Sequence, residues 1–158
     1  MHNLSKHLIL GLCLLAPAAH AASSVQYLRE LDAQEWATQK DLVNVVAMFL
    51  GETQEGHEYE TSLALLKEKG ILRDKGNGFD FDPDARLERG VASLVFARAL
   101  GLKGGWFARV FGLGPRSAYK DMSARGYVRP HGTHSPMTGA DLLGMMRLMV
   151  SDRRRGAL

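Results

Sequence analysis

The stretch LLKEKGILRDKGNGFDFDPDARLERGVASLVFARALG, residues 65–101, decides how this chain folds. Both of its ends carry apolar residues at helical spacing, and each end closes with a glycine. Its acidic middle has the composition of a calcium loop, but an EF-hand loop that starts at Asp74 would need oxygen ligands where Gly76 and Gly78 stand. We therefore interpret the stretch as a short helix, a solvated loop and a longer helix.

The longer helix belongs to a repeat with a period of 50 residues. Three segments align without gaps, and each has an apolar stripe at helical spacing: residues 37–51, 87–101 and 137–151. Thr38 and Thr138 are good N-cap residues, because a threonine oxygen accepts hydrogen bonds from the free amides of the first turn. Asp41 and Asp141 follow three positions later, where an acid suits the helix dipole. The repeat predicts three long helices.

A shorter helix precedes two of the long ones. Residues 62–72 and 118–128 each reach a glycine, Gly70 or Gly126, and an apolar pair follows. This order is typical of a Schellman-type helix end. We predict that residues 22–36 form an N-terminal helix that stands in for the missing short helix of the first unit.

The N-terminus has the pattern of a secretory signal peptide, residues 1–21. A positive charge at Lys6 precedes a short apolar run, and cleavage is predicted after Ala21. Cys13 raises the possibility of lipid attachment, but Leu12 occupies a position where such sites need a small residue. We therefore predict an exported protein, with the bacterial periplasm as the favoured location.

Residues 22–158 contain no cysteine and are long enough for one domain with a hydrophobic core. We assign residues 37–151 to a repeat domain with an insertion at 102–117. The basic tail, residues 152–158, is expected to be frayed. We identify no other segment that is long and apolar enough to span a membrane.

Charge is distributed unevenly along the chain. Residues 22–97 carry 8 basic and 14 acidic side chains, a net charge of −6, whereas residues 98–158 carry 11 basic and 3 acidic ones, a net charge of +8. Such asymmetry can steer an anionic partner to one end. In an exported protein this partner would be a cell-wall polymer, a lipid headgroup or an acidic protein rather than nucleic acid. Alternatively, the two halves attract each other within the fold.

The order of these features resembles the S-layer homology domain. That repeat runs from a short helix through a Gly-Ile pair and a loop with Phe-x-Pro to a Thr-Arg-Ala-Glu motif that opens a second helix. Here Phe81 and Pro83 match the Phe-x-Pro, and Arg89 matches the motif arginine. The resemblance covers residues 37–151, although no copy of the motif is complete.

The resemblance implies a mainly α fold with pseudo-threefold symmetry, in which a central three-helix bundle is surrounded by shorter helices and loops. It also implies binding of cell-wall glycan or peptidoglycan in grooves between repeats, through the motif arginine and its neighbours. The implied ligand contacts are the motif positions of the three units: Arg89, Glu88, Gly90, Thr38, Lys40, Asp41, Thr138 and Asp141. Alternatively, Arg89 forms an intrachain salt bridge with Asp84 or Glu88.

A second interaction surface is possible in GGWFARVFGLG, residues 104–114. Aromatic residues anchor many protein interfaces, so Trp106, Phe107, Arg109 and Phe111 are candidates for binding an envelope protein or an assembly partner. The alternative is a short helix packed on the core.

We predict no catalysis, cofactor or metal. His131 and His134 lack an apparent third ligand for zinc, and no serine lies in a G-x-S-x-G turn. The sequence therefore predicts a non-catalytic binding protein of the cell envelope.

Overall fold

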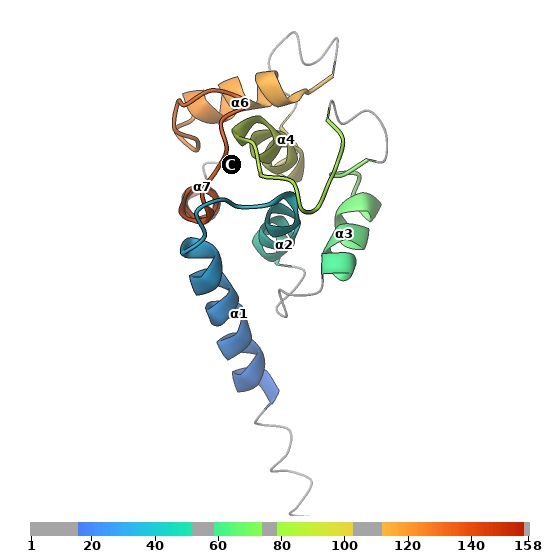
Figure 1. The fold of residues 1–158 in the computed structure, drawn as a ribbon, viewed down its shortest axis with the longest axis vertical. Coiled ribbons are helices and arrows are strands. Elements are labelled where there is room, and N and C mark those ends of the chain that lie inside the picture. The colour runs from blue at the N-terminus through green and yellow to red at the C-terminus, as the bar shows by residue number, and fades with distance from the viewer. Residues whose placement is uncertain (1–15, 52–58, 74–78, 103–111, 157–158) are drawn as a thin grey trace, which may run out of the picture.

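The computed structural model describes residues 16–51, 59–73, 79–102 and 112–156. The described residues form helices and no strand, with two isolated β-bridges, so the prediction of a mainly α fold is confirmed (Figure 1). The helices are α1 Ala16–Asp32, α2 Gln39–Leu50, α3 Tyr59–Glu68, α4 Arg89–Ala99, α6 Pro115–Ala124 and α7 Gly139–Arg154.

Helices α2 and α7 begin at the two predicted threonine N-caps. In α2, the Thr38 Oγ1 atom accepts from the Asp41 amide at 3.2 Å, and the Asp41 carboxylate accepts from the Thr38 amide at 2.8 Å. This reciprocal pair is a capping box. In α7, Thr138 accepts from the Asp141 amide at 3.0 Å, but the carboxylate of Asp141 accepts from Arg89 instead of completing a capping box.

The short helices end as the glycine pattern predicted. Gly70 has a φ of 67°, and the amides of Gly70 and Ile71 donate back into the last turn of α3 at 2.9 Å. Gly126, with a φ of 79°, closes α6 in the same way. These are Schellman endings, and they favour glycine because other residues rarely adopt a positive φ.

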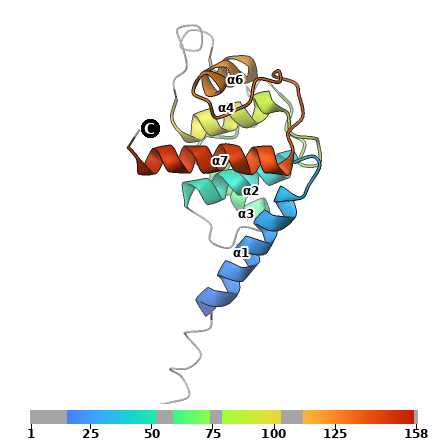
Figure 2. The same ribbon diagram turned by 90° about the vertical axis from the view of Figure 1, so that its left-hand side faces the viewer.

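Helices α2, α4 and α7 carry the core, and one further helix covers each of them. Helix α2 packs on both α4 and α7, while α3 packs on α2, α6 on α4 and α1 on α7 (Figures 1 and 2). Helix α1 therefore packs on α7 as α3 packs on α2 and α6 on α4, and it ends at Asp32, before the predicted end at residue 36. That residues 22–36 stand in for the missing short helix stays a prediction. The start of α1 at Ala16 lies before the predicted cleavage after Ala21, and the cleavage stays a prediction.

The residues that precede the three long helices bond to one another in a closed ring. The Ala37 amide donates to Met137, the Met137 amide to Leu87 and the Leu87 amide back to Ala37, at 2.8–2.9 Å. All three residues are buried, and they lie at intervals of 50 in the sequence. Two β-bridges, Thr38 with Arg86 and Glu88 with Pro136, flank the ring. The ring holds the starts of α2, α4 and α7 together.

The core beneath this ring is apolar and continuous. Phe49 of α2 and Phe96 of α4 meet edge to face, with ring centroids 5.8 Å apart. Burying one large apolar side chain contributes roughly 1.5–3 kcal/mol. The largest fully buried side chains in the long helices include Leu42, Leu94, Phe96, Leu142, Met145 and Met149.

The start of the basic tail is helical rather than frayed. Helix α7 continues to Arg154, three residues beyond its predicted end. Asp152 accepts a hydrogen bond from the Tyr127 hydroxyl at 2.7 Å, and Arg153 donates to the Phe49 carbonyl at 3.3 Å. These contacts join the end of α7 to two other parts of the fold, and sequence spacing alone does not show them.

Candidate functional site

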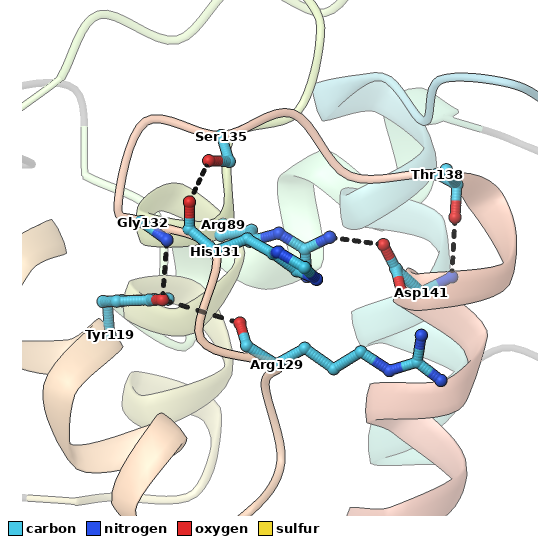
Figure 3. A network of polar contacts seen from close by, with 8 residues as sticks. All are labelled: Arg89, Tyr119, Arg129, His131, Gly132, Ser135, Thr138 and Asp141. Atoms are coloured by element: carbon cyan, nitrogen blue, oxygen red, sulfur yellow. Dashed lines mark hydrogen bonds and ion pairs between the residues drawn. The ribbon is translucent and has the colours of Figure 1, made fainter.

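The candidate site lies where the starts of α4 and α7 meet. We call it the α4–α7 junction: Arg89, Thr138, Asp141 and the loop of residues 129–136. An Nη atom of Arg89 lies 2.5 Å from a carboxylate oxygen of Asp141, and the two side chains are 7% and 21% exposed (Figure 3). The intrachain salt bridge therefore exists, but its partner is neither Asp84 nor Glu88.

One N–H donor of the Arg89 guanidinium has no acceptor. Its Nε atom is buried and has no hydrogen-bond partner. An unsatisfied buried donor costs about 1–3 kcal/mol, more for a charged group. The junction thus holds a buried arginine that one acid fixes and whose Nε donor has no acceptor.

The loop of the junction packs closely over the start of α4. The Arg89 amide donates to the Ser135 carbonyl at 3.0 Å, and the Gly90 amide donates to the Thr133 carbonyl at 2.8 Å. A Cβ atom on Gly90 would lie 2.4 Å from the Thr133 methyl group. Gly90, a predicted ligand contact, is therefore buried, and its lack of a side chain lets the loop approach.

Tyr119 of α6 and the loop itself fix the loop's path. The Tyr119 hydroxyl accepts from the Gly132 amide at 2.9 Å and donates to the Arg129 carbonyl at 3.5 Å. Ser135 donates to the His131 carbonyl at 2.5 Å. The side chains of Arg129 and His131 are exposed, and Arg129 extends toward the first turns of α7, as Arg89 does (Figure 3). The junction therefore presents one cation, Arg129, at its rim in addition to Arg89 inside.

Glu88, another predicted contact, lies at the outer edge of the junction. Its carboxylate is 2.8 Å from His134 Nδ1, and the two side chains are 43% and 69% exposed. Exposed ion pairs contribute little to stability, about 0–1 kcal/mol. Glu88 and His134 are therefore accessible to a ligand.

The positions equivalent to Arg89 in the other two units are Gln39 and Gly139, so neither of those units supplies an arginine. Gln39 accepts from the Asp82 amide at 3.3 Å. A Cβ atom on Gly139 would lie 1.6 Å from the Leu31 carbonyl oxygen, so α1 occupies the space that a side chain would need. Only the α4–α7 junction has a buried arginine at this position.

The predicted contacts of the first unit serve local structure. Thr38 and Asp41 form the capping box, and Asp41 also accepts from the Tyr27 hydroxyl at 3.2 Å. Burial and the charge of Asp41 raise the pKa of Tyr27 well above its ordinary value. Lys40 is exposed, with its ammonium 5.8 Å from the centre of the Tyr59 ring. The structure therefore brings Arg89, Thr138 and Asp141 together but leaves Thr38, Lys40 and Asp41 elsewhere.

A cavity of about 310 Å³ lies away from the junction, beside α3. It is lined by Leu63, Lys67, Leu72, Arg73, Phe79, Asp80 and Phe81. In the described part of the chain, no three His, Cys, Asp or Glu side chains are grouped to hold a metal ion. The predicted interaction residues Trp106, Phe107, Arg109 and Phe111 lie outside the described residues.

Sequence reasoning missed the Arg89–Asp141 pair, although a signal existed. The two residues are 52 positions apart, which is one repeat period plus the two positions that separate an arginine from an acid in the motif. Tyr119 and Arg129 carry no such signal, because they join the site only through the path of the loop.

The comparisons with known proteins add no relative. No family model, curated protein sequence or solved structure matches this chain. Among the helices in the described ranges, none combines the length and apolar character needed to cross a membrane.

Proposed function

We propose that this chain is an exported, non-catalytic protein that binds cell-wall glycan or peptidoglycan through an S-layer-homology-like repeat domain. The proposed arrangement has pseudo-threefold symmetry, with α2, α4 and α7 as its central helices. Two observations support it: the closed ring of backbone hydrogen bonds among Ala37, Leu87 and Met137, and the covering of each central helix by one further helix.

The α4–α7 junction is the proposed ligand site, and the free Nε donor of Arg89 is the observation that carries this assignment. An acidic group of the polymer would accept from this donor once binding uncovers it, since a guanidinium can serve two acceptors at once. Asp141 holds the guanidinium in place, and its partial exposure leaves the pair open to solvent. Arg129 and His131 would add exposed donors at the rim.

A pull-down with purified sacculi tests this function. Because Arg89 variants can lose stability, the first variant is Arg129→Gln, which removes an exposed charge from the rim. The matched control is Arg86→Gln, an exposed arginine that lies over the Trp36 ring, with 5.2 Å to its centroid, away from the proposed contacts.

We expect the wild-type protein and Arg86→Gln to sediment with sacculi, Arg129→Gln to sediment several-fold less, and 0.5 M salt to weaken binding in all cases. Absence of wild-type binding would rule out the function. Equal loss in both variants would place the ligand outside the junction.

A further inference from the structure

The strongest feature that the proposed function does not use is an unpaired set of exposed cations on α6, α7 and the segment between them. We call this set the basic face. It consists of Arg116, Lys120, Arg125, Arg147 and Arg154. Within the described part of the chain, none of these side chains forms an ion pair or a hydrogen bond.

The geometry of α6 directs its charges outward. Ala118 and Met122 are fully buried and lie on the side of α6 that packs on α4. Arg116 and Lys120 are one helical turn apart, about 200° around the helix from Ala118. Their side chains therefore point away from the domain.

Helix α7 carries the rest of the basic face. Helices α6 and α7 lie on one side of the molecule, and α3 lies on the opposite side (Figure 1). In the view of Figure 2, α7 crosses the front of the molecule, with α4 above it and α6 above α4. Its outward residues include Arg147, Arg154 and Leu148, and Leu148 is 47% exposed. Only one other large hydrophobic side chain among the described residues, Val25 on α1, is as exposed.

The nearby acids do not neutralise this face. Asp141 is held by Arg89, and Asp152 is held by Tyr127 and Arg155. Asp121 is the remaining acid between residues 98 and 158. Within the described part of the chain, the acids of residues 98–158 therefore form no ion pair with the basic face.

We propose that the basic face docks on the anionic phosphate headgroups of a lipid membrane. The exposed cations are spread over two helices, which suits an extended anionic surface better than a single enclosed chain. Clustered Lys and Arg side chains are attracted to anionic leaflets, and an exposed leucine among them can enter the headgroup region. Together with the proposed ligand site, this would hold the protein between a membrane and the cell wall.

Vesicle co-sedimentation tests the proposal. The probes are vesicles of phosphatidylcholine alone and vesicles with 30 mol% phosphatidylglycerol, each at about 50 mM and about 500 mM NaCl, between which screening rises strongly. The readout is the ratio of binding to the two compositions, because the apolar run at residues 8–15 would affect both equally. We expect a clear preference for the anionic vesicles that 500 mM NaCl abolishes.

The test variant is Arg116→Gln with Lys120→Gln, and the charge-matched control is Lys67→Gln with Lys69→Gln at the C-terminal end of α3. Each charge near an anionic surface contributes roughly fivefold to binding, so the α6 pair should weaken anionic-vesicle binding about 25-fold. The control pair should retain the binding, with folding of both checked by circular dichroism. Equal weakening by the control pair, or no preference for anionic vesicles, would overturn the proposal.

Two further readouts separate this inference from the proposed function. Arg89→Gln should leave vesicle binding intact even where it lowers sacculus binding, since Arg89 is buried away from the basic face. A different result would identify an anionic glycan as the partner of the basic face. In that case the α6 double variant lowers sacculus binding, the wild type does not bind anionic vesicles, and the lipid proposal is wrong.

Discussion

Replacing Arg89 with methionine should lower the free energy of unfolding by about 2–3 kcal/mol. Removing one partner of a buried ion pair typically costs about 3–5 kcal/mol, because the other charge stays buried and unpaired. Two features reduce this cost here. Asp141 is 21% exposed, so water can solvate it in part, and the substitution also removes the unsatisfied Nε donor of Arg89.

A double-mutant cycle with Asp141→Asn isolates the interaction, with unfolding followed by circular dichroism in urea. We expect a coupling free energy of about 2 kcal/mol between Arg89 and Asp141, and a melting temperature about 6–10 °C lower for Arg89→Met. The control is Arg86→Met, whose exposed contact with Trp36 should contribute no more than about 1 kcal/mol. A coupling energy below about 0.5 kcal/mol would refute a stabilising contribution of the Arg89–Asp141 ion pair between α4 and α7.

Three other predictions address the helix contacts and the insertion. Gly139→Ala should destabilise the domain by at least about 3 kcal/mol in urea, because its Cβ would collide with a backbone oxygen of α1. Gly144→Ala, with no atom within 4 Å of the new Cβ, should be neutral or stabilise by up to about 1 kcal/mol, and equal effects would contradict the packing of α1 on α7. The hydrogen bond from Tyr127 lowers the pKa of Asp152 below its ordinary 3.8, so the associated stability is present above pH 3.8 and lost as the pH falls through the lowered pKa. Tyr127→Phe should therefore be less stable than the wild type at pH 6 and approach it in acid, and a constant difference would contradict this origin. Trp106→Ala should leave sacculus binding within twofold of the wild type, whereas a larger loss would favour the insertion as the interaction surface.

The sequence predicted local structure well because local chemistry determines helix ends. Thr38 and Thr138 mark the starts of α2 and α7, and Gly70 and Gly126 mark the ends of α3 and α6. Each of these signals acts within one turn of its helix. The extension of α7 to Arg154 was missed because contacts with distant parts of the chain hold that last turn.

Contacts between units could not be predicted in the same way. The 50-residue period identifies equivalent positions, but it does not state which units lie side by side. The Arg89–Asp141 pair depends on α4 meeting α7, and the requirement for glycine at position 139 depends on α1 packing against α7. The expectation that every motif position contacts a ligand also overlooked local roles, since Asp41 caps its own helix and Gly90 admits a loop.

The most direct test of the account follows the Nε–Hε resonance of Arg89 by NMR while soluble peptidoglycan fragments are added. We predict a saturable shift of this resonance, because an acidic group of the ligand accepts from the donor that is unsatisfied in the free protein. The Arg86 resonance should stay in place. Saturable binding that shifts other resonances and leaves Arg89 Nε–Hε unchanged would contradict the assignment of the α4–α7 junction as the ligand site.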